Sequence, residues 1–328
     1  MGVRFIPVSS REEFMAYRSK GIGASEVGTL KGLNKHECRL SLYHLKLGIK
    51  PPKRTNLRMN IGKISEDITA RLYTYHDYDL DVFNYNMDNL IVTKKLEEVN
   101  AYCINDKYPN LFVSLDRREI FKDGTFGAVE LKNKTNEAYS EWKNEMNPCE
   151  ALQLASQLMA SEYKLGHIVY LVGNDKVEVF PMQYSVAIKS AKMIMTEINS
   201  FWSKIENARI ITNQIHYEKD RFNMKAVAEL TLELMKCEPE PEFTEAYLQY
   251  MTDLSIEKRN SVPLKGTDEQ LMWAKGHKKT IEKIKKLEKE KAEFASKLAH
   301  AMGDKKEIDF GKDGKVSLFG RFSNKVKI

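Results

Sequence analysis

Long hydrophobic runs are missing from this chain of 328 residues. No stretch approaches the roughly 18 consecutive apolar residues that a transmembrane helix requires, so no membrane span is expected. The N-terminal sequence MGVRFIPVSSREEF also lacks the apolar segment of a secretory signal. It begins like a myristoylation motif, but Ile6 stands where that motif requires serine or threonine. We therefore expect a protein without a membrane anchor.

Cysteine is scarce as well. The four cysteines, at positions 38, 103, 149 and 237, do not show the two-to-four-residue spacing typical of zinc and iron–sulfur sites. The seven histidines show no catalytic or metal-binding spacing either. We expect four free thiols in a reducing compartment, which predicts a cytoplasmic protein.

Excess charge is modest overall but uneven along the chain. The net charge is +6, yet residues 1–63 contain 13 Lys and Arg against 4 Asp and Glu, a net charge of +9. The remaining 265 residues therefore sum to −3. A basic N-terminal quarter is the electrostatic footprint expected of a phosphate-binding surface. A chance local excess on a solvated surface is the alternative explanation.

Hydrophobic periodicity predicts helices and strands throughout the first 210 residues. The strands are expected as two hairpins, 111–121 with 125–134 and 167–172 with 176–182. Asn147 and Pro148 predict the start of a helix, as its N-cap and first residue. The helices are expected over residues 9–20, 25–33, 38–48, 60–76, 148–163 and 185–209. This order predicts an α/β fold with a central mixed β-sheet flanked by helices.

One of these helices shows a regular apolar stripe. Within residues 60–76, the side chains Ile64, Ile68 and Leu72 recur at helical spacing, followed by Tyr75. Glu66 falls off this stripe, near the first turn.

The character of the chain changes after residue 210. Residues 237–251 are acidic, contain two prolines and predict a linker that leads into a helix. A long, highly charged helix is expected over residues 267–302, followed by a terminal hairpin. We therefore predict a core, residues 1–210, and a helical extension, residues 211–328.

The segment GAVELKNKT, residues 127–135, places Glu130 and Lys132 two residues apart in a predicted strand. Alternate residues of a strand point to the same face, so this carboxylate and this ammonium lie side by side. A solvated face with a weak ion pair is one explanation. The other is an active site, because Asp116 lies on the neighbouring predicted strand, about 4.8 Å away.

Asp116 and Glu130 are then close enough to share a cation. Two carboxylates and the backbone carbonyl of Leu131 form the hard oxygen site that suits Mg²⁺. The side chain of Leu131 points to the opposite face of the sheet, into an apolar core. Lys132 would orient a metal-bound water and help it lose a proton, while the metal lowers the pKa of that water. This arrangement predicts metal-assisted phosphodiester hydrolysis.

The D-x13-E-x-K spacing on paired strands resembles the PD-(D/E)XK nuclease superfamily. More specifically, the chain is similar to the YqaJ-like viral recombinases, the family that includes the phage lambda-type exonucleases. The similarity rests on motifs in the family's order, namely YRSKGIGASEVGTLKGL (17–33), GKISEDITARLY (62–73), PCEALQLASQLMAS (148–161) and the GKVSLFGRF strand after the long helix. The resemblance implies that the predicted core is a PD-(D/E)XK nuclease domain.

The resemblance also implies roles for individual residues. Asp116, Glu130 and the Leu131 carbonyl would bind the metal ion, Mg²⁺ with Mn²⁺ as a substitute. Lys132 would be the catalytic lysine. Glu66 would face the same site from its helix, through a second metal ion or a water.

Four further residues are implicated by the same resemblance, and a fifth by its proximity to them. Gln153 or Gln157 would approach the site from the following helix, and the choice between them stays open because residues four apart share a helix face. Arg18 and Ser25 match positions that bind the 5′-phosphate of the degraded strand. Arginine is suited to forked phosphate contacts, and Ser25 would lie at a helix N-terminus. Lys35, which is near in sequence, is a third candidate phosphate contact.

Two residues depart from the family pattern. The family has a small residue or proline before the aspartate and a glycine after it, where this chain has Leu115 and Arg117. Arg117 either contacts the DNA backbone or crowds the site. A plain structural explanation is also open for Arg18, which could pair with Glu12 or Glu13.

The resulting prediction is a Mg²⁺-dependent deoxyribonuclease, a 5′-to-3′ exonuclease that resects linear duplex DNA ends in phage-type recombination. The implied partners are DNA ends, a single-strand annealing protein and further copies of the chain in a trimeric ring, in the cytoplasm of a bacterial host. A PD-(D/E)XK endonuclease of restriction or repair type is one alternative. The other is a non-catalytic DNA-binding protein on a nuclease fold.

Overall fold

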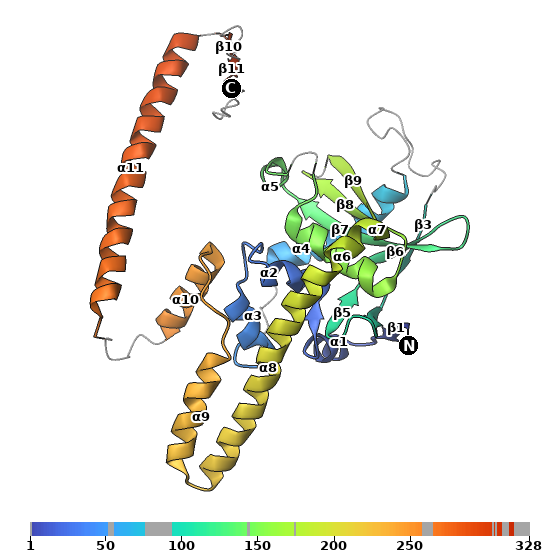
Figure 1. Ribbon diagram of the computed structural model, residues 1–328. Coiled ribbons are helices and arrows are strands. Elements are labelled where there is room, and N and C mark those ends of the chain that lie inside the picture. The colour runs from blue at the N-terminus through green and yellow to red at the C-terminus, as the bar shows by residue number, and fades with distance from the viewer. Residues whose placement is uncertain are drawn as a thin grey trace. The chain divides into compact units, whose positions relative to one another are not determined.

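The computed structural model describes residues 2–51, 56–75, 94–142, 145–173, 175–257, 265–303, 305, 307–309 and 315–317. Contacts divide the chain into two compact units, Met1–Lys258 and Arg259–Ile328, which are described separately (Figure 1). The predicted boundary after residue 210 lies inside helix α8 (Ala191–Asp220). The division into a core and an extension at that residue stays a prediction.

The described strands of unit 1 form two sheets. The first has the strand order β3 (Lys95–Glu98), β6 (Arg117–Ile120), β7 (Phe126–Lys134), β8 (Leu165–Val172) and β9 (Lys176–Gln183). Its β7 and β8 pair in parallel and its other neighbours pair antiparallel, so this sheet is mixed. The second has the order β1 (Val3–Pro7), β4 (Ala101–Asn105), β5 (Leu111–Ser114) and β2 (Ile22–Gly23).

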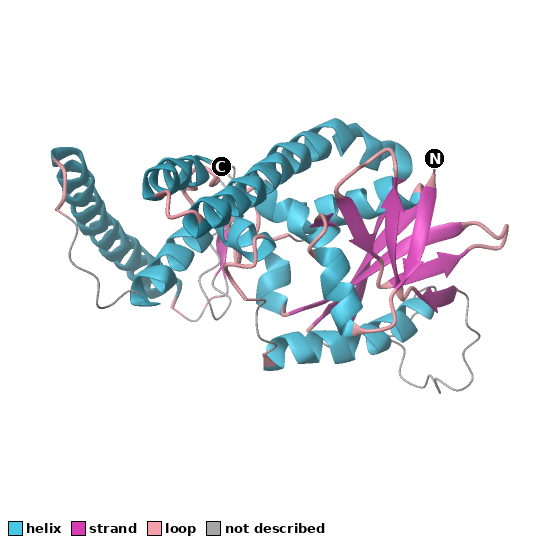
Figure 2. Cartoon of the chain, turned by 90° about the horizontal axis from the view of Figure 1, so that it is seen from below, coloured by secondary structure: helices cyan, strands magenta, loops and turns pink. Residues whose placement is uncertain are grey.

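Helices cover both faces of the five-stranded sheet, as Figure 2 shows. On one face, α4 (Leu57–Thr74) packs Tyr73 into a small cluster with Leu131 and Val169. On the other face, α6 (Pro148–Ser161) packs Leu154 and Leu158 into the main core. The predicted α/β fold with a mixed sheet flanked by helices is confirmed.

The start of α6 follows the predicted local chemistry. The side chain of Asn147 caps the helix by accepting a hydrogen bond from the Cys149 N–H at 2.9 Å, and Pro148 is the first helical residue. The helix ends where Glu162 adopts a left-handed conformation with φ of 57°. The β8–β9 hairpin that follows is also confirmed.

The strand predicted over residues 111–121 is wrong, because the chain forms two strands there. β5 ends at Ser114 in the four-stranded sheet, and β6 begins at Arg117 in the five-stranded sheet. Leu115 and Asp116 therefore carry the chain from one sheet to the other. The alternating pattern continues through this crossing, so periodicity could not locate it.

The first half of the predicted apolar stripe of α4 does not face the core, although Tyr75 at its end is buried. Ile64 is 69% exposed and Ile68 is 52% exposed, whereas Ser65, Thr69 and Tyr73 are buried against the sheet. Short side chains at two of these positions let the helix axis approach the sheet closely. The buried hydroxyl groups are satisfied within the helix, since Thr69 Oγ1 donates to Ser65 O at 2.7 Å.

Unit 1 has further helices besides α4 and α6. The helix predicted to end near residue 207 continues to Asp220 as α8, and α9 (Met224–Lys236) lies beside it in Figure 1. The others are α1 (Arg11–Arg18), η1 (Ala24–Glu26), α2 (Val27–Leu30), α3 (Arg39–Lys46), α5 (Asn136–Ser140), α7 (Tyr184–Ala187), η3 (Ile188–Ser190) and α10 (Glu245–Glu257).

Unit 2 contains the predicted long helix, α11 (Asp268–Met302). Its first turn has a capping box, in which Thr267 and Gln270 each bond the other's backbone N–H. The strands β10 (Glu307–Asp309) and β11 (Lys315–Ser317) pair antiparallel, which confirms a terminal hairpin. No helix within the described ranges has both the length and the apolar character needed to cross a bilayer.

Candidate active site

Asp116 lies where the chain crosses from one sheet to the other. The ladder between β6 and β7 ends at the pair Arg117 and Val129, so the Leu131 N–H that follows on β7 has no hydrogen-bond partner on β6. Asp116 Oδ2 accepts a hydrogen bond from the Leu131 N–H at 2.9 Å and takes the place of such a partner. The crossing thereby holds the Asp116 carboxylate against β7.

Glu130 lies on the face of β7 that meets α6 and is only 2% exposed. Its Oε1 accepts hydrogen bonds from Lys132 Nζ and from Gln153 Nε2, both at 2.5 Å. Its Oε2 accepts one from Gln157 Nε2 at 2.6 Å. A buried carboxylate needs such donors, because unpaired burial of a charge is costly. Three side chains therefore fix the position of Glu130.

The choice that the sequence left open between the two glutamines is resolved by geometry, because both contact Glu130. Gln157 is the more buried, at 1% exposure, and its Nε2 also donates to Ser114 O at 3.0 Å. This second bond ties α6 to the end of β5. Within the described residues, Gln157 Oε1 is buried and has no hydrogen-bond partner. The site therefore retains one unused buried acceptor.

Electrostatics in this cluster are strongly perturbed. Burial raises the pKa of Asp116 to about 8, and the neighbouring Glu130 carboxylate adds to the shift. Burial by itself would lower the pKa of Lys132, but the carboxylates of Glu130 and Asp116 outweigh it and raise that pKa. Lys132 therefore stays an ammonium ion at neutral pH, while Asp116 is close to titration.

Glu66 faces the same region from α4. It lines a cavity of about 590 Å³ together with Asp116, Arg18 and Lys63. Burial raises the pKa of Glu66, and the Glu130 carboxylate contributes to the shift. Glu66 follows Ile64 by two residues, so it lies on the side of α4 away from that exposed side chain and faces the cavity.

The donor set fits a hard divalent cation. No three His, Cys, Asp or Glu side chains converge on a metal-binding geometry within the described residues. The candidate ligands are therefore the pair Asp116 and Glu130 with a backbone oxygen, as the sequence predicted. Two carboxylates this close repel each other, which is one reason why the pKa of Asp116 is raised. A bound Mg²⁺ would remove that repulsion and accept oxygen ligands of this kind.

Arg117, which departs from the family pattern, has its guanidinium bonded to other residues of the same chain. Its guanidinium forms an ion pair with Asp67 and a weaker one with Glu98 at 3.8 Å. It also donates to Asp116 O at 2.7 Å. Its side chain is 12% exposed, so it braces the crossing after Asp116 and presents little charge to solvent.

The three residues assigned to phosphate binding lie in different surroundings. Arg18, at the end of α1, lines the same cavity as Asp116 and pairs with Glu26, not with Glu12 or Glu13. Ser25 is exposed in η1, and the helix that follows has four residues, so its dipole is short. Lys35 is exposed and pairs with Glu141 at 2.6 Å. The described cavity lining includes Arg18 but neither Ser25 nor Lys35.

A further, partly buried contact extends the row of charges on β7, and the sequence did not predict it. Lys134 Nζ lies 2.5 Å from Glu150 Oε1, and the Tyr170 hydroxyl donates to Glu150 Oε2 at 2.7 Å. Glu130, Lys132 and Lys134 thus face three polar residues of α6. Those residues, at 150, 153 and 157, have the helical spacing i, i+3 and i+7, which was the available signal.

The mixed sheet, with Asp116 directly before β6 and Glu130 and Lys132 on the adjacent strand β7, has the arrangement predicted for a PD-(D/E)XK core. Residues 13–164 match the family model described as the YqaJ-like viral recombinase domain. The predicted resemblance to the YqaJ-like family is therefore confirmed over these residues, which make up a little less than half of the chain.

Individual relatives are distant. The chain is 25% identical over 173 residues to the protein YqaJ of Bacillus subtilis (strain 168), an alignment that covers 51% of this chain and 48% of YqaJ. The chain thus spans about half the length of this relative. The chain is also similar to two crystal structures of the alkaline exonuclease LHK-Exo from Laribacter hongkongensis. The identity is 17% and the TM-score 0.47 for LHK-Exo by itself, and 15% and 0.48 for its complex with dAMP. Both superpositions cover 65% of this chain, and 98% and 99% of LHK-Exo.

Proposed function

We propose that this protein is a Mg²⁺-dependent deoxyribonuclease that digests one strand of linear duplex DNA from its end, in the 5′-to-3′ direction. The observation that carries the proposal is the convergence of Asp116, Glu130 and Lys132, of which Asp116 also lines the cavity. The YqaJ-like domain over residues 13–164 supports the same class of activity.

In this proposal, Asp116, Glu130 and the Leu131 carbonyl hold the cation. When bound, the ion lowers the pKa of an attacking water and stabilises negative charge on the phosphate. Gln153 and Gln157 keep the Glu130 carboxylate in one orientation, since each donates to one of its oxygens. Glu66, which lines the same cavity as Asp116, contributes a third carboxylate.

Lys132 acts as a hydrogen-bond donor. Its raised pKa keeps the side chain protonated at neutral pH, so it does not take the proton of the water. The ammonium instead orients the water and stabilises the charge that develops on the phosphate oxygens. The proposal thus assigns Lys132 a narrower role than the sequence suggested.

Recognition of the DNA end is assigned mainly to Arg18. Because Arg18 and Asp116 line one cavity, a terminal 5′-phosphate on Arg18 brings the adjacent phosphodiester toward the carboxylates. Ser25 and Lys35 remain secondary candidates, and Lys35 must leave Glu141 to take part.

Finer parts of the proposal rest on the family resemblance. They are a role in recombination in the cytoplasm of a bacterial host, a single-strand annealing partner, and a homotrimeric ring around DNA. Light scattering of the purified protein, with and without duplex, tests the trimer directly. A monomer under both conditions would remove the ring from the proposal.

The activity is tested with 5′-phosphorylated linear duplex and closed circular duplex, each incubated with protein and Mg²⁺. Loss of linear DNA alone, with release of mononucleotides from the 5′ end, is the expected result. Cutting of the circle would indicate an endonuclease. Binding without cleavage of either substrate would indicate a non-catalytic DNA-binding protein.

Two lysine variants separate chemistry from charge. Lys132→Met should abolish hydrolysis and retain DNA binding, because it removes the donor at the phosphate but not the end contacts. Lys107→Met removes the same charge from an exposed pair with Glu162 and should retain activity. Equal loss in both variants would contradict a catalytic role for Lys132.

A further inference from the structure

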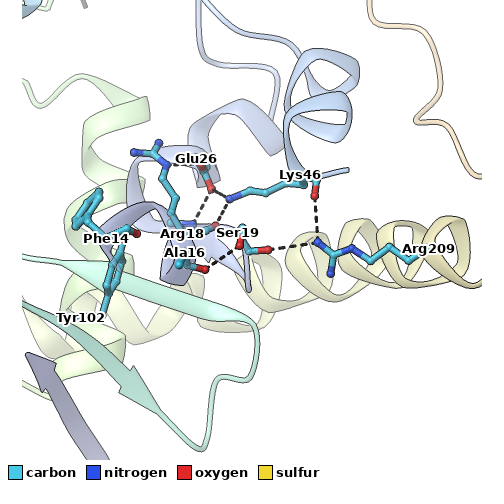
Figure 3. A network of polar contacts seen from close by, with 9 residues as sticks. Phe14, Ala16, Arg18, Ser19, Glu26, Lys46, Tyr102 and Arg209 are labelled. Atoms are coloured by element: carbon cyan, nitrogen blue, oxygen red, sulfur yellow. Dashed lines mark hydrogen bonds and ion pairs between the residues drawn. The ribbon is translucent and has the colours of Figure 1, made fainter. Parts of the chain in front are cut away.

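Glu26 is a carboxylate that the proposed chemistry does not use, and it is almost completely buried, at 2% exposure. Figure 3 shows Arg18 and Lys46 reaching it from either side. Arg18 Nε lies 2.9 Å from Glu26 Oε1, and Lys46 Nζ lies 2.7 Å from Glu26 Oε2. The Gly23 N–H also donates to Oε2 at 2.8 Å.

Lys46 is held as firmly as Glu26. Its side chain is 2% exposed, and its Nζ donates a second bond to Arg18 O at 2.7 Å. Arg209, from α8, donates to Lys46 O at 3.0 Å, as Figure 3 also shows. Lys46 therefore cannot swing out to contact a ligand, and its charge acts from a fixed position.

Among the side chains in direct contact, two cations share one carboxylate, a local net charge of +1, while the Glu37 carboxylate also attracts both cations without pairing with either. Burial by itself would raise the pKa of Glu26, but Lys46 and Arg18 together lower it, so the carboxylate stays ionised. Lys46 is enclosed, whereas the Arg18 side chain is 34% exposed and lines the cavity beside Asp116. The surplus positive charge is thus presented to the cavity through Arg18.

The contact through Nε also determines how Arg18 can be used. A guanidinium has five N–H donors, and a bond from Nε leaves the two terminal nitrogens available for a forked contact with phosphate. Within the described residues, the ion pair recorded for Arg18 is the one that Nε makes with Glu26. Glu26 therefore fixes the plane of the guanidinium without occupying its outer edge.

We propose that Glu26 and Lys46 are positioning residues for recognition of a 5′-terminal phosphate by Arg18. Glu26 orients the guanidinium, and Lys46 offsets the charge of Glu26, so Arg18 meets the phosphate with its full positive charge. This inference rests on the end-recognition part of the proposed function. It adds that specificity for the phosphate depends on a buried lysine that never touches DNA.

The test measures binding, so it does not depend on hydrolysis. All proteins carry Lys132→Met, and the dissociation constants for 5′-phosphorylated and 5′-hydroxyl duplex ends are measured by fluorescence anisotropy. The quantity of interest is the ratio of the two constants, which a general loss of folded protein does not change. The variants are Lys46→Met, Glu26→Gln with Lys46→Met, Arg18→Met, and Lys31→Met as control.

We expect the background protein to prefer the phosphorylated end. Lys46→Met leaves Glu26 to cancel the charge of Arg18 and should lower the preference by about tenfold, typical of one charge-assisted hydrogen bond. Adding Glu26→Gln removes the opposing charge and keeps an acceptor for Nε, so the preference should return to within about threefold of the background. Lys31→Met breaks a half-exposed pair with Glu197 at 3.0 Å and should change nothing.

The double variant also protects the test against misfolding, because it removes one buried charge of each sign. If it loses the preference as completely as Arg18→Met does, the positioning role is wrong and the proposed exonuclease activity still stands. An unchanged preference in Lys46→Met has the same consequence. No preference in the background protein would overturn both this inference and 5′-end recognition.

Discussion

Gly28 lets α2 lie directly against the first turn of α6, and replacing it by alanine should force the two helices apart. A β-carbon at Gly28 would lie 2.1 Å from Cys149 Sγ, and 3.2 Å and 3.3 Å from Cys149 Cβ and Cα. Carbon and sulfur in contact need more than about 3.5 Å, so the Sγ must rotate away or the helices must separate. Even after rotation of the thiol, the backbone contact stays tight.

We expect Gly28→Ala to lower the free energy of unfolding by about 1–3 kcal/mol, the usual cost of overpacking. Because α6 carries Gln153 and Gln157, its displacement should also loosen their bonds to Glu130 and reduce hydrolysis. Urea unfolding followed by circular dichroism measures the stability, and digestion of linear duplex measures the activity. The loss of activity should exceed what the unfolded fraction explains.

A double-mutant cycle identifies the cause. Cys149→Ala removes the Sγ, so Gly28→Ala in that background should recover more than half of the lost stability. Gly62→Ala is the matched control, because no atom lies within 4 Å of the added carbon inside α4. It should stabilise the helix by about 0.5–1 kcal/mol. Additive effects of the two substitutions, or a neutral Gly28→Ala, would refute the packing explanation.

Three other predictions concern buried polar groups. Gln157→Met should lower the free energy of unfolding by about 1.5–3 kcal/mol in chemical denaturation, because Glu130 Oε2 loses its donor; a change below 0.5 kcal/mol would contradict this. In metal-free protein, the pKa of Asp116 is about 8 in the folded state and lies at its ordinary value, near 4, in the unfolded state. Between these two pH values the folded state binds one more proton than the unfolded state, so the free energy of unfolding should fall as the pH rises. Asp116→Asn should flatten that dependence in thermal melts at each pH, and an unchanged pH profile would count against it. Tyr73→Phe should cost about 1–3 kcal/mol in urea unfolding, because the hydroxyl donates to buried Glu119 at 2.8 Å; wild-type stability in this variant would be the contrary result.

Much of the fold was predictable because its signals are local. The start of α6 could be located from Asn147 and Pro148, and the β8–β9 hairpin from two apolar strands around a turn. Glu130 and Lys132 were predicted to share a face, since that depends only on the pleat of one strand. Properties of a single element follow from a short window of residues.

Other features depend on contacts that a short window does not contain. The break at Asp116 was missed, because the same alternating pattern suits one long strand or two strands in different sheets. The buried face of α4 was missed, because close packing against the sheet favoured Ser65 and Thr69 over the larger side chains of the stripe. The alternative explanation for Arg18, a pair with Glu12 or Glu13, was wrong, because its partner is Glu26.

By itself, the sequence determined the kinds of elements, the shared face of Glu130 and Lys132, and the resemblance of residues 13–164 to the YqaJ-like family. Only the tertiary structure decided that both Gln153 and Gln157 bond to Glu130 and that Lys132 stays protonated. It also decided that Lys46 and Arg18 share the carboxylate of Glu26. These outcomes arise from burial and from distances between groups far apart in the chain. Such distances set the charge of each group, and no periodicity in the sequence records them.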